Sequence, residues 1–359
     1  MSQHKLSAAF KCSCFAKKKS LFLIVLVFGL LGYILWILKW NQRFDDREQV
    51  SFRLPYRYQK NVFPESELVV TYIHQPQHLV STEEKKNFVT FFVKSAPRNF
   101  KRRKIIRQTW GLYSSLDNLN FTVIFLIGSV SNKFQNKINL ESECFDDILQ
   151  TTFDDTFRNL TIKTLSAFKW ITQKMAKKSM FYVISDDDCV INLMETVKFL
   201  QTKVENGKPI DNRIYCGFQY ESINGVIRGK HRLSTSWSQY PALRYPSFCR
   251  GVMVILTFPM IVDIYEMSKV TNYTGFPLED VMVYGILRHK LGHNGKDISA
   301  VINGGHPIMF YPWDNNNKSL LIKMKRMWKL WLPEMLNVTT VIKRNMTDKT
   351  CPDYFLPAG

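Results

Sequence analysis

Residues 181–192 read FYVISDDDCVIN, and this stretch constrains the fold more than any other part of the chain. Residues 181–184 are apolar, aromatic or β-branched, which is typical of a buried strand. Three carboxylates, Asp186, Asp187 and Asp188, follow at once. Adjacent like charges repel one another and resist burial, so we expect a divalent cation that takes oxygen ligands to offset them. A solvated acidic turn is the alternative, because an Asp-x-Asp pattern also arises by chance.

Apolar strand-like runs alternate with helical runs on both sides of this stretch. The predicted strands are 88–93, 121–127 and 252–258, and the predicted helices are 160–175 and 278–291. This alternation predicts an α/β fold in which a central, mostly parallel sheet is flanked by helices. Ligands of such sheets bind beyond the carboxyl ends of the strands, which is where the three aspartates lie.

An apolar segment near the N-terminus predicts a membrane anchor. Residues 21–38, LFLIVLVFGLLGYILWIL, carry no charge, and several lysines but no acidic residue precede them. This asymmetry predicts a single-pass type II membrane protein with a cytosolic tail (1–19), a signal anchor (20–38) and a lumenal remainder. A cleaved signal peptide is the alternative, but no Ala-x-Ala-like site follows. We expect residues 39–85 to form a stem and residues 86–359 the globular domain.

Sequons and cysteines agree with a lumenal location. The Asn-x-Ser/Thr sequons that could be glycosylated are at Asn120, Asn159, Asn272, Asn317, Asn337 and Asn345. The cysteines beyond the anchor are Cys144, Cys189, Cys216, Cys249 and Cys351. Their number is odd, so at least one thiol is free or paired with another chain, and the sequence leaves the pairing open.

The net charge of +19 would suggest nucleic acid as a partner for a cytosolic protein. A lumenal domain meets no nucleic acid, so we expect anionic small molecules such as nucleotide diphosphates, or acidic membrane surfaces.

Three further groups of residues could take part in chemistry. Arg103 and Arg107 are four residues apart in a basic segment, so on a helix they would share one face and could bind a diphosphate; a solvated basic face is the alternative. Asp280 follows Glu279 at the start of a predicted helix, where it could be a general base or simply a favourable partner of the helix dipole. His306 could reach a metal, although an ordinary loop histidine is the simpler interpretation.

Five motifs occur along the chain in a recognisable order. They are IRQTWG (106–111), FDDTFRNLTIKT (153–164), SDDDCVIN (185–192), YPSFCRG (245–251) and LEDVMVYG (278–285). Together they resemble the motifs of glycosyltransferase family 31, which contains β-1,3-galactosyl-, N-acetylglucosaminyl- and N-acetylgalactosaminyltransferases. The chain departs from the family pattern at Phe157, where Tyr is usual, and has one extra residue between Asp280 and Gly285.

The resemblance implies a GT-A fold, a manganese ion and a UDP-sugar donor. It implies that Asp186 and Asp188 bind the metal and diphosphate, with Asp187 between them in the donor site. It places Arg103 and Arg107 in the segment that lines the nucleotide site.

Asp280 falls where the family has its catalytic base. A carboxylate there would take the proton of an acceptor hydroxyl as it attacks the anomeric carbon, and displacement on an α-linked donor would give a β product. The implied function is an inverting, Mn²⁺-dependent β-1,3-glycosyltransferase of the Golgi membrane. It would move galactose or an N-acetylhexosamine to a hydroxyl of a glycolipid or glycoprotein glycan. An inactive family member that binds glycans or chaperones an active transferase is the alternative.

Overall fold

The computed structural model describes residues 29–35, 54–55, 58, 67–80, 88–175, 179–210, 212–219, 225–303, 305–312, 316–337 and 340–344. The chain divides into two compact units, Met1–Arg53 and Leu54–Gly359, and the second contains the sheet. In the first unit residues 29–35 are helical, while the rest of the predicted anchor (20–38) lies outside the described residues. Every helix that the structure describes is too short or too polar to span a bilayer.

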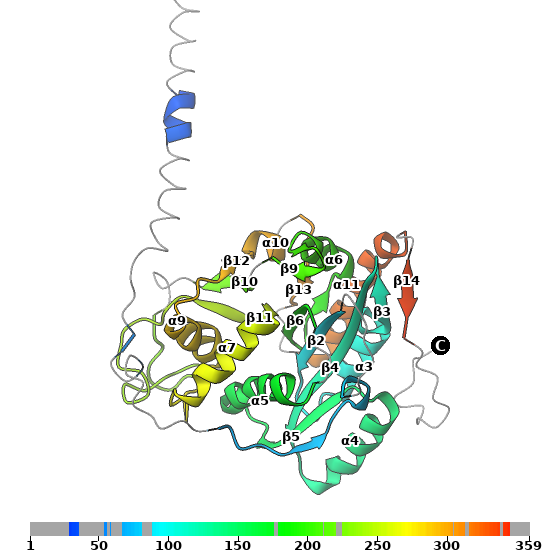
Figure 1. The fold of residues 1–359 in the computed structure, drawn as a ribbon, viewed down its shortest axis with the longest axis horizontal. Helices are drawn as coiled ribbons and strands as arrows, with labels where there is room; N and C mark the ends of the chain where they lie inside the picture. The colour runs from blue at the N-terminus through cyan, green and yellow to red at the C-terminus, as the bar shows by residue number, and fades with distance from the viewer. Residues whose placement is uncertain are drawn as a thin grey trace, which may run out of the picture. The chain divides into compact units, whose positions relative to one another are not determined.

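A ten-stranded mixed sheet forms the centre of the second unit, with the strand order β1-β5-β4-β2-β6-β11-β10-β12 (Figure 1). Strands β3 and β14 extend it beside β4. The bounds are β1 (Tyr72–His74), β2 (Phe88–Lys94), β3 (Tyr113–Leu116), β4 (Leu119–Ser129), β5 (Ile148–Asp154), β6 (Phe181–Asp186), β10 (Ile214–Gln219), β11 (Phe248–Thr257), β12 (Lys296–Asp297) and β14 (Val341–Lys343). Because β1 pairs with β5, part of the predicted stem (39–85) belongs to the globular fold.

The sheet is parallel at its centre and again where β12 joins β10 at one edge, and antiparallel elsewhere, which corrects the expectation of a mostly parallel sheet. Strands β5, β4, β2 and β6 run parallel to one another. Strand β11 runs antiparallel to both β6 and β10, and β1 runs antiparallel to β5. Parallel neighbours need a crossover connection, and the central parallel strands are joined through helices. Strands β10 and β11 follow one another directly in the order of elements, and residues 220–247, here called the excursion, connect them.

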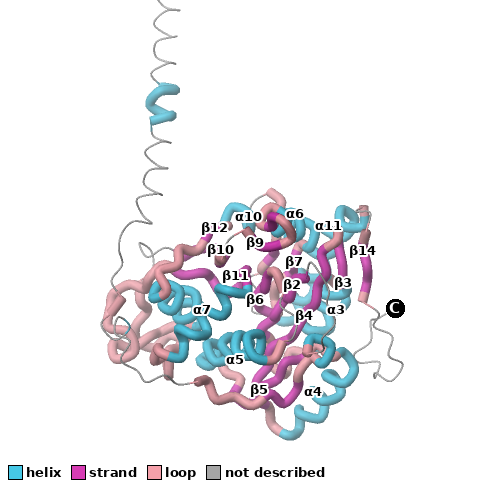
Figure 2. The backbone as a smooth tube through the Cα atoms, viewed as in Figure 1, coloured by secondary structure: helices cyan, strands magenta, loops and turns pink. Residues whose placement is uncertain are grey.

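Helices cover both faces of the sheet. Alternate residues of β2 point to opposite faces, so the Phe91 ring meets Trp110 (centroids 5.5 Å apart) while the Phe92 ring meets Trp170 on the other face (6.3 Å). Figure 2 shows α5 and α7 side by side over one face. The helix bounds are α3 (Phe100–Gln108), α4 (Asn132–Phe145), α5 (Leu160–Gln173), α6 (Leu193–Gln201), α7 (Phe258–Lys269), α8 (Glu279–Val281), α9 (Arg288–Lys290), α10 (Ser299–Asn303) and α11 (Asn317–Leu336).

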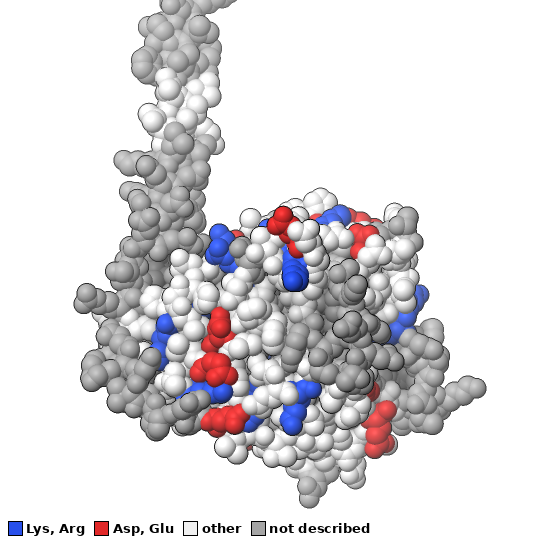
Figure 3. Space-filling model, in the orientation of Figure 1, with Lys and Arg blue, Asp and Glu red and all other residues white. Residues whose placement is uncertain are grey.

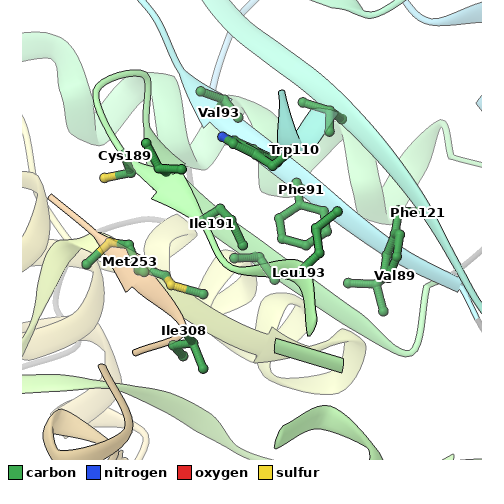
Figure 4. Close-up of a cluster of buried hydrophobic side chains, with 14 of the residues drawn as sticks. Val89, Phe91, Val93, Trp110, Phe121, Cys189, Ile191, Leu193, Met253 and Ile308 are labelled. Carbon is green, nitrogen blue, oxygen red and sulfur yellow. The ribbon is translucent and has the colours of Figure 1, made fainter. Parts of the chain in front are cut away.

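A large hydrophobic core of described residues lies between the sheet and helices α3, α6 and α11. Figure 4 shows part of this core, in which Phe91 and Trp110 pack near the short strand that follows the aspartates. That strand, β7 (Val190–Ile191), pairs with β13 (Met309–Phe310), and β8 (Val204–Glu205) pairs with β9 (Lys208–Pro209). Apolar residues of β6 before the acidic triplet and of β7 after it therefore anchor both ends of the acidic turn in this core.

The helix predicted at 278–291 is interrupted. It consists of α8, a π-helical turn (Met282–Leu287) and α9, and it ends before Gly292, which has a φ of 69°. A π-helical turn takes up one residue more than an α-helical turn. The extra residue after Asp280 is accommodated there, and Gly285 still packs so closely that a Cβ on it would lie 3.0 Å from Phe248 Cβ.

The predicted sequons differ in how accessible their asparagines are. Asn337 is exposed at the end of α11, whereas Asn120 is half-buried in β4. The side chains of three others are engaged: Asn159 donates to the carbonyl of Asp154, Asn272 accepts from the backbone of Thr274, and Asn317 accepts from Arg102. Asn345 lies outside the described residues.

The structure shows how the described cysteines beyond the predicted anchor are paired. Cys216 and Cys249 form a disulfide between β10 and β11, and Cys144 is also disulfide-bonded. Cys189 is a free, buried thiol, which confirms the prediction of at least one unpaired cysteine.

Candidate active site

The aspartate triplet lies where β6 ends, next to a buried lysine that ends the neighbouring strand. Because β2 and β6 run in parallel, Lys94 pairs in register with Asp186. The Lys94 Nζ lies 3.2 Å from Asp186 Oδ1 and 3.0 Å from Glu279 Oε2, and it donates to the carbonyl of Gly251 at 3.0 Å. Burial alone would lower the pKa of Lys94, but Asp186 and Glu279 raise it well above its ordinary value. Lys94 is therefore a permanent cation that joins β2, β6 and α8.

Asp187 is the member of the triplet whose carboxylate is fully used in hydrogen bonds to the protein. It is buried, and its carboxylate accepts hydrogen bonds from Ser95 Oγ (2.7 Å), Asn99 Nδ2 (2.8 Å) and Arg102 Nη1 (2.7 Å). These donors lie on the loop after β2 and the start of α3. Asp187 therefore fixes the basic segment beside the triplet.

Asp188 is the member whose charge is least compensated. Its side chain is 23% exposed, and its nearest cation is Arg102 Nη1 at 3.5 Å. Burial, together with the charges of Asp186 and Asp187, raises the pKa of Asp188 to about 7. A partly exposed carboxylate with an unfavourable negative charge, next to a second carboxylate in Asp186, suits a hard divalent cation with oxygen ligands.

Asp280 and Glu279 are adjacent but differ in availability. Glu279 is buried and accepts from Lys94 Nζ and from Thr164 Oγ1, the latter at 2.6 Å. Asp280 is half-buried, and its one hydrogen bond within the described chain comes from the backbone N–H of Val281, at 2.9 Å. Burial and the charge of Glu279 raise the pKa of Asp280 to about 7. Asp280 is thus the carboxylate poised to exchange a proton near neutral pH.

Gly251 allows β11 to pass directly over these carboxylates. A Cβ at this position would lie 2.9 Å from Glu279 Oε2, 3.2 Å from Lys94 Nζ and 3.4 Å from Asp280 Cβ. A side chain at this position would force the carboxylate of Glu279 or the ammonium group of Lys94 to shift. The glycine that ends the YPSFCRG motif is therefore required by the close approach of strand and site.

The motif at 153–164 supports the site from α5. Lys163 Nζ donates to the carbonyl of Ser95 at 2.9 Å and lies 2.8 Å from Asp155 Oδ1. Thr164 is the residue that bonds Glu279. One turn of α5 therefore fastens the loop after β2 and the carboxylates of α8.

Arg103 and Arg107 do not face the triplet, which corrects the prediction that they bind a donor. Arg103 is fully buried and binds Glu141 through Nε (2.8 Å) and Nη2 (2.6 Å). Arg107 binds Asp147 through Nε (2.9 Å) and Nη2 (2.7 Å), and Glu141 through Nη1 (2.7 Å). Neither guanidinium can reach a ligand without leaving its partners. The arginine of α3 that reaches the triplet is Arg102.

The prediction that His306 could reach a metal stays a prediction. His306 lies with Glu195 and Glu334, and the ligand atoms of these three are within 4.8 Å of one another. Lys198 Nζ lies 2.7 Å from Glu195 and 3.5 Å from Glu334, so this group already contains a cation.

A pocket of about 380 Å³ opens at the carboxyl ends of β2, β4 and β5. It is lined by Ala96, Pro97, Arg98, Ser129, Val130, Ser131, Phe134, Asp154 and Asp155. The Arg98 guanidinium lies over the Phe134 ring, 4.7 Å from its centroid. Ser95 and Lys163 connect the pocket to the acidic turn, because Ser95 bonds Asp187 and Lys163 bonds both Ser95 and Asp155. The size suits a small polar molecule.

Sequence reasoning missed Lys94, and it named Arg102 only as one of the basic residues around Arg103 and Arg107 that could bind a diphosphate. Lys94 had a recognisable signal, since a charged residue that ends an otherwise apolar strand, FVTFFVK, needs a buried partner. Arg102 had none, because one arginine among five neighbouring basic residues cannot be told from the others before the inward face of α3 is known. On the face seen in Figure 3 the described Lys and Arg side chains are scattered, without one large basic surface.

Comparisons with known proteins agree with the motifs. A family model described as "Galactosyltransferase" matches residues 101–298. The beta-1,3-galactosyltransferase bre-5 of Caenorhabditis elegans is 28% identical over 284 residues, which cover 77% of this chain and 84% of that protein. The human UDP-GalNAc:beta-1,3-N-acetylgalactosaminyltransferase 1 is 32% identical over 55% of this chain and 58% of its own length. The human lactosylceramide 1,3-N-acetyl-beta-D-glucosaminyltransferase is 29% identical over 60% of this chain and 58% of its own length. These matches thus span less than two thirds of the two human relatives.

A solved structure of a glycosyltransferase involved in glycosylation of the major capsid of PBCV-1 aligns with 66% of this chain and 98% of its own. Its TM-score of 0.35 and identity of 8% are too low to carry an argument.

Proposed function

The chain belongs to the galactosyltransferase family, and we propose that it is an inverting, metal-dependent β-1,3-glycosyltransferase. The family resemblance inferred from the five motifs is thereby confirmed. We propose a UDP-sugar donor carrying galactose or an N-acetylhexosamine, and an acceptor hydroxyl on a glycolipid or glycoprotein glycan. The observation that carries this proposal is Asp280, an available carboxylate with a pKa of about 7 that shares its electrostatic surroundings with Asp186 and Lys94.

The pocket and the triplet supply the two halves of a donor site. The pocket after β2, β4 and β5 would take the nucleoside, with Arg98 and Phe134 available to contact the base. The diphosphate would then extend toward Asp188 and Arg102. This arrangement is the GT-A type of nucleotide-sugar site that the motifs imply, at the carboxyl ends of parallel strands.

A divalent cation, Mn²⁺, fits the triplet. Asp188, with Asp186, would hold it, while Asp187 keeps its three hydrogen bonds to the protein. When bound, the cation would offset charge on the diphosphate of the leaving group. Lys94 stays in place and keeps Asp186 oriented.

Asp280 acts on the acceptor. It takes the proton of the acceptor hydroxyl as that oxygen forms a bond to the anomeric carbon, and the bond from that carbon to the β-phosphate oxygen breaks, its electron pair leaving with UDP. The attack comes from the face opposite UDP, so an α-linked donor gives a β-linked product. Glu279 cannot do this work, because Lys94 and Thr164 occupy its oxygens.

We also propose that the chain is a type II protein of the Golgi membrane with a lumenal catalytic domain. The support is the uncharged run at 21–38 with lysines before it, together with a disulfide and sequons beyond it. This location leaves no nucleic acid as a partner.

A donor panel tests the proposed function. The full chain is given UDP-galactose, UDP-N-acetylglucosamine or UDP-N-acetylgalactosamine with a set of glycan acceptors, with and without Mn²⁺. One donor should give a β-1,3-linked product in the presence of the metal. Asp188→Ala and Asp280→Ala should each lose at least about 100-fold in rate while the melting temperature is kept, and Glu143→Gln, an exposed carboxylate of α4, should transfer normally.

Transfer by either aspartate variant at the normal rate would remove that residue from the mechanism. Binding of glycans without transfer from any donor would favour the inactive, glycan-binding alternative.

A further inference from the structure

Helix α11 (Asn317–Leu336) packs against the core with one of its faces. It contacts α3, α6 and β7, and its buried side chains are those of Leu320, Met324, Trp328 and Met335. These buried positions are four or seven residues apart, so they form one stripe along the helix. The opposite face of α11 points to solvent.

The outward side of α11 is positively charged. Residues 317–333 contain no acidic residue and five exposed basic residues, Lys318, Lys323, Lys325, Arg326 and Lys329. Across the described residues, Lys325, Arg326 and Lys329 form no ion pair with a carboxylate. The first acidic residue of the helix is Glu334, which lies 3.5 Å from Lys198 of α6. Like charges this close together, without counter-charges, attract an anionic surface.

Large apolar side chains lie among these cations. Ile322 is 60% exposed and Leu330 is 65% exposed. Ile322 is three residues before Lys325, and Leu330 is four residues after Arg326, so cationic and apolar side chains are neighbours on the outward side. The α11 surface is defined as the exposed residues Lys318, Ile322, Lys325, Arg326, Lys329 and Leu330.

The combination of charge and apolar area identifies the partner. A soluble anion gains nothing from the exposed side chains of Ile322 and Leu330. The surface of an anionic lipid bilayer satisfies both kinds of side chain, because it offers negative headgroups to the cations and the boundary of the acyl chains to the apolar groups.

We propose that the α11 surface docks on the anionic headgroups of a lipid bilayer. This docking goes beyond the proposed glycosyl transfer and does not depend on it. It would give the globular unit a fixed orientation at the membrane. Asn317, the first residue of α11, accepts a hydrogen bond from Arg102 at 2.7 Å, and Arg102 binds Asp187. The helix that docks is thus joined directly to the acidic turn.

Photocrosslinking in the full chain tests the docking. The photoreactive residue benzoylphenylalanine takes the place of Leu330, and the protein is reconstituted in vesicles of phosphatidylcholine with or without phosphatidylserine. Crosslinks from position 330 to lipid should be at least about fivefold more frequent with phosphatidylserine, since one cation near an anionic surface contributes about fivefold to binding. The same photoreactive residue in place of Leu140, which is 45% exposed on α4, should give an equally low yield in both kinds of vesicle.

Charge variants identify the residues responsible. Lys325→Gln/Arg326→Gln/Lys329→Gln should lose at least about 10-fold of the lipid crosslinking at position 330. Its melting temperature should stay unchanged, because the three side chains are exposed. The matched control is Lys137→Gln/Lys208→Gln/Lys230→Gln, which removes the same charge from exposed positions in α4, β9 and the excursion and should crosslink like the wild type.

Equal crosslinking in the two kinds of vesicle, no lipid crosslink at position 330, or an equal loss in the two triple variants would overturn the docking. Crosslinks from position 330 to a second copy of the chain instead of to lipid would also overturn it and would identify the α11 surface as a subunit interface. Glycosyl transfer to soluble acceptors is measured separately, so failure of the docking leaves the proposed function intact.

Discussion

The neighbouring carboxylates Glu279 and Asp280 have different roles because their surroundings differ. Glu279 and Asp280 are consecutive, yet Glu279 is held by Lys94 and Thr164 while Asp280 keeps an oxygen available. The sequence identified Asp280 as a candidate base only through its motif. Lys94 of β2 and Thr164 of α5 decide which of the two carboxylates is engaged in hydrogen bonds, and both residues are far from Glu279 in the sequence.

The pKa of Asp280 predicts the pH dependence of transfer. The base must be ionised to accept a proton, and burial with the charge of Glu279 raises its pKa to about 7. Transfer at saturating metal should therefore rise about tenfold per pH unit below neutrality and level off above it. Rates of the wild type from pH 5.5 to 8.5 check this. A flat profile over that range, with chemistry rate-limiting, would remove Asp280 as the base.

Lys94 is predicted to matter for stability as well as for activity. Lys94→Met removes the cation between Asp186 and Glu279 and leaves two carboxylates close together, so the free energy of unfolding should fall by about 3–5 kcal/mol. Urea unfolding measures it, with Lys101→Met on the exposed side of α3 as control. The double variant Lys94→Met/Glu279→Gln should recover part of the loss, because it removes one of the unpaired charges; an additive loss would contradict this pairing.

At the scale of elements, the positions of the core strands were predictable and the directions in which they pair were not. Apolar runs located β2, β4, β6 and β11, because burial leaves a clear pattern in composition. The same runs carry no information on direction, so the antiparallel pairing of β11 with β6 and β10 went unpredicted. The π-helical turn after Asp280 was also unpredicted, although its cause, one extra residue, was visible in the motif.

Helix α3 shows the same limit. The spacing of Arg103 and Arg107 correctly places them on one face, but only the packing of α4 and β5 shows that this face points inward to Glu141 and Asp147. A cluster of basic residues can therefore stabilise the fold instead of binding a ligand, when it pairs with buried carboxylates.

Glu141→Gln tests the structural role of these arginines. It leaves two buried guanidinium groups with one carboxylate, so the free energy of unfolding should fall by about 3 kcal/mol while the donor KM of the folded protein stays unchanged. Arg102→Gln should raise the donor KM, and its loss of stability should be the smaller one because Asp187 keeps Ser95 and Asn99 as hydrogen-bond donors. Thermal unfolding and donor titrations measure both. A raised donor KM in a well-folded Glu141→Gln variant would return Arg103 and Arg107 to the donor site.

At the scale of the whole molecule, the family could be inferred from five short motifs, several of which mark a residue that the site needs. Gly251 allows β11 to approach, Thr164 fixes Glu279, and Asp187 fixes the loop after β2. The pairing of cysteines could not be inferred, since five cysteines admit many connectivities.

The disulfide between Cys216 and Cys249 ties the antiparallel half of the sheet together two residues before Gly251. The double variant Cys216→Ser/Cys249→Ser removes a link that closes a sequence separation of 33, so the free energy of unfolding should fall by about 3 kcal/mol. Denaturant titration of the variant and of the wild type measures the difference. Unchanged stability would show that strand pairing alone holds β10 to β11.

The cation at the triplet is the claim on which the proposed chemistry depends. Crystals of the protein grown with UDP and MnCl₂ locate it directly, through the anomalous signal of manganese. We predict a peak bonded to an oxygen of Asp188 and to the diphosphate, with Asp187 still holding Ser95, Asn99 and Arg102. A peak only at Glu195, His306 and Glu334, with Asp188 turned to solvent, would contradict it.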